Sequence, residues 1–172
     1  MLRRIDIKTK NGFTLIETLS AIFIILIGLV SGLSLITQTI SFMSLASSKL
    51  VASYLTQEGI EIVRNIRDNN WLIGRTGPGV WRTNIDNGDW QAGYNDLSLN
   101  NYNSNDRLLI DSATGLYSYD SGGVASKFQR KISINQGADG LDERIKVTVS
   151  TEWEQKGKLY SVSAQEYLYN WR

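Results

Sequence analysis

A single stretch limits what this chain can fold into, namely the apolar run from Phe13 to Ile36. The run contains 24 residues, and Glu17 is the only ionisable one among them. At 1.5 Å per residue, a helix of this length extends about 36 Å, enough to cross the hydrocarbon core of a bilayer with some tilt. The run therefore predicts a transmembrane helix.

Glu17 conflicts with an apolar environment. A charged side chain at the centre of a membrane helix costs about 2.5–3.5 kcal/mol, and less near the membrane interface. Ionisable residues inside membrane segments are rare, and they usually have a partner and a function. We therefore expect Glu17 to have a functional role and a partner of opposite charge.

The charges that flank the run predict its orientation. Residues 1–12 contain four basic side chains, and the next basic residue is Lys49. Because positive charge is retained on the cytoplasmic side, we expect the N-terminus inside and the rest of the chain outside. An ordinary single-pass anchor and a secretory signal peptide are the alternatives. The apolar region of a signal peptide is typically about 7–15 residues long and precedes its cleavage site. The run of 24 residues is longer than the apolar region of a signal peptide.

The residues Gly12-Phe13-Thr14-Leu15-Ile16-Glu17 and the apolar helix that follows resemble the processing signal of type IV prepilins and the related pseudopilins. The resemblance covers residues 3–40. It implies that Gly12 ends a leader cut by a prepilin peptidase, and that Phe13 becomes a methylated N-terminus. It also implies that Glu17 meets the Phe13 amine of a neighbouring subunit. A buried charge is tolerated when it is paired in this way.

Composition narrows the possible functions. The chain has 18 basic and 17 acidic residues, and loss of residues 1–12 leaves 14 and 16. This balance disfavours a nucleic-acid partner. There is no cysteine and no histidine, which excludes disulfides, zinc–thiolate sites and a Ser-His-Asp triad. We therefore expect no catalytic residue, no metal site and no cofactor. Many major pilins close their C-terminal region with a disulfide, so the resemblance favours a minor subunit.

The helix is predicted to continue beyond the span, because no proline occurs between Phe13 and Asn70. Apolar or small residues recur at helical spacing on one side of this segment, at Leu45, Ala52, Leu55, Gly59, Ile62 and Ile66. Charged residues on the opposite side, Glu61, Arg64 and Asp68, are spaced for weak pairing. The sequence predicts one helix of about 55 residues with an amphipathic second half, ended by signals at Asp68–Asn70 and Gly74.

The last third of the chain shows the period-two alternation of β-strands. Residues 107–110 and 116–119 flank a turn and predict a hairpin, and residues 128–134, 145–149 and 159–169 predict three antiparallel strands. The region before them is rich in Gly, Asn and Asp, with a first strand possible at residues 89–94. We expect an α+β fold in which the amphipathic half of the long N-terminal helix packs on a C-terminal antiparallel sheet.

The expected organisation has three parts. Residues 1–12 form a cleaved leader, residues 13–40 a transmembrane and assembly helix, and residues 41–172 an extracytoplasmic pilin-like domain. Within that domain we expect helix to about residue 70, an irregular region at 72–106 and antiparallel sheet at 107–170.

Gly28 and Gly32 form a G-x-x-x-G pair inside the span. The pair allows three interpretations, which the sequence leaves open. It permits close packing of neighbouring helices, it softens the helix, or it reflects the ordinary frequency of glycine in membrane helices.

Three other groups of residues are weaker candidates. Oxygen ligands at 84–89 and at Asp139, Asp142 and Glu143 invite a calcium site, but their spacing does not match a calcium loop. Glu152 and Glu154 share a strand face, where a solvated surface is the simpler interpretation than acid–base chemistry. The aromatic residues, Trp171 among them, form either a binding surface or core.

The sequence thus predicts a structural protein rather than an enzyme. It is expected to be a minor pilin or pseudopilin of a type IV pilus or type II secretion-like filament, with roles such as adhesion or motility. Its expected partners are the prepilin peptidase, other pilin subunits, the inner-membrane assembly machinery and, before assembly, the membrane. The alternative is a filament-tip module that binds DNA or surfaces. These residues do not distinguish a pilus from a secretion pseudopilus or a competence system.

Overall fold

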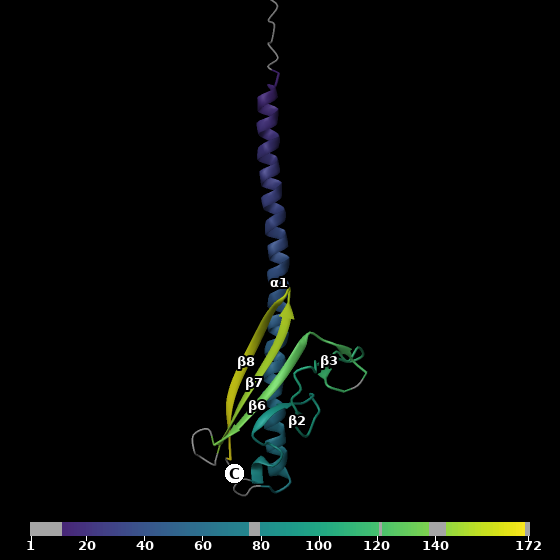
Figure 1. The fold of residues 1–172 in the computed structure, drawn as a ribbon, viewed down its shortest axis with the longest axis vertical. Helices are drawn as coiled ribbons and strands as arrows, with labels where there is room; N and C mark the ends of the chain where they lie inside the picture. The colour runs from purple at the N-terminus through teal and green to yellow at the C-terminus, as the bar shows by residue number, and fades with distance from the viewer. Residues whose placement is uncertain (1–11, 76–79, 121, 138–143, 171–172) are drawn as a thin grey trace, which may run out of the picture. The chain divides into compact units, whose positions relative to one another are not determined.

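The computed structural model describes residues 12–75, 80–120, 122–137 and 144–170 (Figure 1). The chain divides into two compact units, Met1–Ser44 and Leu45–Arg172. The elements are α1 (Leu15–Leu72), the 3-10 turn η1 (Val80–Arg82), β1 (Gly88–Gln91), β2 (Asn100–Asn101), β3 (Leu109–Ile110), β4 (Tyr117–Ser118), β5 (Val124–Ala125), β6 (Phe128–Gln136), β7 (Arg144–Gln155) and β8 (Lys158–Tyr169). The fold class is α+β, as expected.

The single long helix is confirmed, and its first part has no covering. α1 runs for 58 residues. Every large apolar side chain from Phe13 to Met43 is exposed. Among the described residues, this is the one helix long and apolar enough to cross a membrane. Such a surface is unstable in water, so this part of α1 requires a bilayer or other protein around it.

The second part of α1 buries the predicted stripe. Ala52, Leu55, Gly59, Ile62 and Ile66 are all buried, and Leu45 packs at the border of the core, half-buried. The stripe lies against one face of the sheet formed by β6, β7 and β8, which Figure 1 shows side by side. The amphipathic pattern therefore produces the contact that the sequence predicted.

A capping motif ends α1 at Leu72, between the predicted stop signals at Asp68–Asn70 and at Gly74. Gly74 has a φ of 82°, its N–H donates to the Trp71 carbonyl, and the Arg75 N–H donates to the Asn70 carbonyl. This is the Schellman arrangement, which satisfies the last carbonyls of a helix and favours glycine in the left-handed conformation.

The main sheet has the order β2-β1-β6-β7-β8, and all its pairs are antiparallel. The predicted meander is confirmed, because β6, β7 and β8 are consecutive in the sheet as in the chain. Lys156 and Gly157 turn β7 into β8 with φ values of 54° and 72°. Two positive φ angles are typical of the type I′ turn that matches the twist of a hairpin.

A second, smaller sheet has the order β4-β3-β5. β3 and β4 pair antiparallel, which confirms the predicted hairpin. The first strand expected at residues 89–94 forms with shifted bounds, since β1 covers Gly88–Gln91, and it lies in the main sheet between β2 and β6. Residues 72–106 thus contribute strands β1 and β2, short because Asn and Gly favour turns around them.

Gly59 marks a close approach between α1 and the sheet. A Cβ atom built on Gly59 would lie 2.7 Å from Val149 Cγ1 and 3.1 Å from Arg130 Cδ. Real Cβ atoms essentially never show a contact of 2.7 Å, so a larger residue would force either Val149 or the helix to shift. Glycine at this position therefore lets the backbone of α1 lie directly over the central strands.

Arg130 is fully buried beneath the helix. It lies on the inward face of β6, and its side chain donates to the Leu55 carbonyl at 3.0 Å and to the Ala92 carbonyl. Its Nη1 atom also lies 2.6 Å from Glu58 Oε2. The buried guanidinium therefore joins α1, β6 and the segment after β1.

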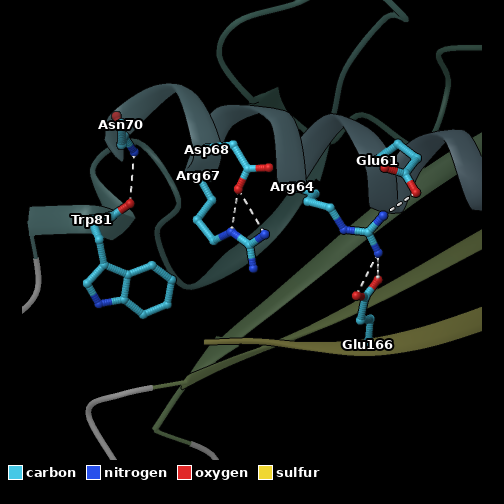
Figure 2. Close-up of polar contacts among 7 residues, drawn as sticks. All are labelled: Glu61, Arg64, Arg67, Asp68, Asn70, Trp81 and Glu166. Carbon is cyan, nitrogen blue, oxygen red and sulfur yellow. Dashed lines mark hydrogen bonds and ion pairs between the residues drawn. The ribbon is translucent and has the colours of Figure 1, made fainter. Parts of the chain in front are cut away.

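Three further polar contacts fix the end of α1, as Figure 2 shows. Arg64 pairs with Glu61 and, at 2.6 Å, with Glu166 of β8. The hydrogen bond to Glu166 is the main reason why the pKa of Arg64 is raised. Asp68 pairs with its neighbour Arg67 rather than with Arg64, because Arg64 is turned toward β8. The expected Arg64–Asp68 pairing is therefore not formed.

We predict different costs for removing the two arginines. Arg130→Ala leaves Glu58 and two buried carbonyls without their donor, so it should lower the free energy of unfolding by about 3–5 kcal/mol. Arg64→Ala removes a partly exposed pair and should cost about 0–1 kcal/mol. Denaturant unfolding of the full chain in detergent, followed by tryptophan fluorescence, compares the two. Equal costs would contradict the assigned role of Arg130.

Candidate functional site

Thr14 begins the helix that carries the proposed signal. The Glu17 N–H donates to Thr14 Oγ1 at 3.3 Å and to the Thr14 carbonyl at 3.1 Å. A threonine oxygen that accepts from the third helical residue is an N-cap, which satisfies one of the free donors of the first turn. The N-cap at Thr14 therefore fixes the position at which α1 begins.

Glu17 lies in the first turn of α1. The aligned peptide dipoles place a partial positive charge at this end of a helix, so a carboxylate is favourable there. Its side chain is exposed, and among the described residues it has no hydrogen bond or ion pair from its carboxylate. Glu17 is therefore an acid placed near a positive helix end and available to a cation from outside the chain.

Gly12 and Phe13 precede the helix and are exposed. No atom lies within 4 Å of the position that a Cβ of Gly12 would take. The Gly12–Phe13 bond lies in non-helical backbone before α1. The structure is compatible with cleavage at this junction.

Gly28 and Gly32 lie one turn apart on α1. Apart from their chain neighbours and the adjacent backbone of α1, no atom lies within 4 Å of the Cβ positions built on them. The side of the helix that carries this pair is therefore open to a close neighbour, which is the geometry in which small residues let membrane helices approach.

The weaker candidates are placed as follows. Trp71, Trp81 and Trp153 are buried in the cores, which agrees with a packing role, and Trp171 lies outside the described residues. Glu152 is half-buried and Glu154 exposed. The segment 84–89 is described, whereas the acidic residues at 139–143 are not. Within the described chain, no group of three or more potential metal ligands gathers.

The comparisons with known proteins bear on the N-terminal signal. A family model described as the prokaryotic N-terminal methylation motif matches residues 7–33. This chain carries a prepilin-type signal. The signal indicates a type IV pilin-like or pseudopilin precursor, and it points to a structural protein. The matched region contains the apolar segment through Leu33 and therefore most of the exposed part of α1. Neither the comparison with curated proteins nor that with solved structures returned a match.

Sequence reasoning missed one residue of this site. Thr14 and Glu17 stand three apart as T-x-x-E, the spacing of a capping box, immediately before an apolar run. That pattern identifies a helix start without a structure. The residues of the prepilin-type signal therefore also form a helix N-terminus.

We predict that Thr14→Ala frays the first turn of α1. The substitution removes the oxygen that accepts the Glu17 N–H and should cost about 1 kcal/mol of local helix stability. Amide hydrogen exchange of the full chain in detergent should show faster exchange at residues 16–18. Thr14→Ser keeps the oxygen and serves as the control, and equal exchange in both variants would contradict the capping role.

Proposed function

We propose that this protein is a structural subunit, a minor pilin or pseudopilin, of a type IV pilus or a type II secretion-like filament. The observation that carries the proposal is the long, fully exposed apolar part of α1 headed by a prepilin-type signal. In the membrane, lipid covers this surface before assembly. In a filament, the same surface is covered by equivalent helices of neighbouring subunits.

The proposed processing step cuts the chain between Gly12 and Phe13 by a prepilin peptidase. Phe13 then carries a positive amine directly before the N-cap Thr14. This charge lies at the positive end of the helix dipole, which is unfavourable unless an acid is near. Methylation of the amine keeps the charge. Processing therefore creates a cation in an apolar environment, and a partner of opposite charge becomes necessary.

Glu17 supplies that partner in our proposal. Its carboxylate on one subunit neutralises the Phe13 amine of the subunit that enters next. Because both charges are removed from water only when they meet, a helix in the wrong axial position leaves two unpaired charges in the apolar bundle. The pair thus sets the register of the incoming helix, while the open sides at Gly28 and Gly32 permit close packing.

The proposed location follows from the same signal. The chain is a single-pass protein of the cytoplasmic membrane, with residues 1–12 inside and residues 41–172 outside. After cleavage the protein leaves the membrane through the inner-membrane assembly machinery. The exposed unit of α1 and β-sheet then faces the periplasm or the exterior.

We predict a mature N-terminus at Phe13. Mass spectrometry of the protein from cells that contain a prepilin peptidase should find residues 13–172 with one methyl group on the amine. Gly12→Ala should be cut more slowly, because the residue before the cut is then larger, and a bulkier residue should block processing. Detection of Met1, or of a cut after the apolar run, would contradict the proposal.

We predict that Glu17→Ala leaves cleavage intact and lowers incorporation into filaments. The variant lacks the carboxylate that meets the Phe13 amine, so the amine of the next subunit stays unpaired. Immunoblots of sheared filaments and of membranes measure the two fractions. Glu17→Asp keeps the charge and is the matched control. Normal incorporation of Glu17→Ala would refute the assigned role.

A further inference from the structure

A pocket lies where the smaller sheet joins the main sheet. Leu108 makes the junction, because its N–H donates to the Phe128 carbonyl of β6 and its carbonyl accepts from the Ser126 N–H, both at 2.9 Å. The pocket beside it has a volume of about 420 Å³, within the roughly 300–1,000 Å³ of small-molecule sites in proteins. We call it the junction pocket. It is lined by four polar residues, Gln91 and Asn105–Arg107, and by Leu109, Tyr119 and Ala125.

A buried glutamine holds the acid of the junction pocket in place. Gln91 of β1 is only 7% exposed, and its Nε2 atom donates to Asp106 Oδ2 at 3.0 Å. Asn103 donates from Nδ2 to Asp106 Oδ1 at 2.9 Å and from its backbone N–H to Gln91 Oε1 at 3.1 Å. Two neutral amides therefore fix the Asp106 carboxylate, and among the described residues it forms no ion pair. Because a carboxylate offers about four acceptor sites, Asp106 can accept from further donors.

The rest of the lining is aliphatic or aromatic. Leu109 of β3 and Ala125 of β5 are partners in the register of the smaller sheet, so they lie side by side. Tyr119 is anchored, because its hydroxyl donates to the Arg130 carbonyl at 3.1 Å. Burial is the main reason why the pKa of Tyr119 is raised, which keeps this hydroxyl protonated. The junction pocket therefore combines apolar surface with a fixed carboxylate.

The charges at the pocket disfavour simple ions. Arg107 donates from Nη1 to the Lys127 carbonyl at 3.0 Å and forms no ion pair among the described residues. A phosphate would meet the negative charge of Asp106, and a cation would meet the positive charge of Arg107. The amide of Asn105 adds a neutral donor and acceptor beside them. This combination suits a neutral ligand with several hydrogen-bonding groups.

A pyranose sugar has the properties that such a pocket requires. Each hydroxyl of a sugar both donates and accepts, which matches a lining that contains carboxylate, amide and guanidinium groups. The C–H groups of the ring form an apolar face, which packs against aliphatic and aromatic side chains. Because the Asp106 carboxylate is already held by Gln91 and Asn103, little conformational entropy is lost when a sugar binds to it.

We propose that the junction pocket binds a neutral sugar residue of a glycan. Asp106 accepts hydrogen bonds from the hydroxyls of the sugar, and Asn105 and Arg107 donate to its oxygens. The C–H face of the ring packs against Leu109 and Tyr119. This binding activity goes beyond the proposed structural role, because it requires the folded Leu45–Arg172 unit and no filament. The proposed topology places this unit outside the cytoplasm, where glycans are accessible.

Saturation-transfer NMR of the full chain tests the proposal. The protein is kept in a zwitterionic detergent, because a detergent with a sugar headgroup would compete for the pocket. The neutral probes are glucose, galactose, mannose and N-acetylglucosamine, and the charged probes are glucuronic acid, glucosamine and leucine. We expect transfer to at least one neutral sugar. Transfer to none of them, or to charged probes alone, would overturn the proposal.

Two substitutions place the bound sugar in the junction pocket. Ala125→Phe fills the pocket and should abolish the transfer. Val124→Phe is its matched control, because Val124 is the exposed neighbour on β5 that does not line the pocket. Asp106→Asn keeps the shape of the side chain but removes its charge, so it should weaken binding about tenfold. Asp86→Asn changes an exposed acid outside the pocket and should leave binding unchanged.

Melting temperatures in the same detergent separate lost binding from lost folding. Ala125→Phe leaves the hydrogen bonds of Asp106 intact, so it decides the assignment even where Asp106→Asn lowers the melting temperature. If Ala125→Phe binds the sugar as the wild type does, the junction pocket is not the site and the proposal fails. The measurement uses the isolated chain, so its failure does not affect the proposed filament role, and a chain that enters no filament can still bind the sugar.

Discussion

The structure of the Leu45–Arg172 unit depends on one contact, in which α1 lies directly on the central strands of the main sheet. Gly59 permits this approach, and the apolar stripe of the helix then closes two cores against β6 and β7. The contact also determines which charged side chains are buried and which groups they pair with. Arg130 is buried because the helix covers it, and Glu58 on that helix becomes its partner. Packing and electrostatics therefore have the same origin in this unit.

α1 has a different environment in each of its two parts. From Phe13 to Met43 its surface is apolar all round and exposed, whereas from Ala52 onward one side is buried and the other carries charge. One continuous helix thus has two parts. The apolar surface of the first part must be covered by lipid or by other helices, whereas the apolar side of the second part packs against the sheet of the same chain. The prepilin-type signal stands at the head of the first part, whose surroundings can change without unfolding the second part.

Much of this fold was accessible from the sequence because its patterns are strong. Absence of proline and regular apolar spacing predicted the helix, and alternation predicted β6, β7 and β8. The burial of Arg130 was missed, although it alternates with Phe128 and Ile132 on the inward face of one strand. An arginine is expected outside unless its partners are known, and the partners of Arg130 come from distant segments of the chain. The pairing of β1 with β6, whose partner residues are 42 to 46 positions apart in the chain, likewise has no local signal. At the candidate site, Gly12, Phe13 and Glu17 were identified by resemblance. The capping role of Thr14 follows from a different signal, the T-x-x-E spacing that marks a helix N-terminus.

Gly59 has a consequence for recognising related proteins. Strand sequences of sheets can change greatly while the alternation is kept, so similarity in the last third of such chains is lost early. A position where no Cβ fits has far less freedom, because every substitution requires the packing between the helix and the sheet to shift. A glycine about two turns into the buried part of the helix, facing a β-branched residue on a central strand, is therefore a physical marker that can outlast the surrounding sequence.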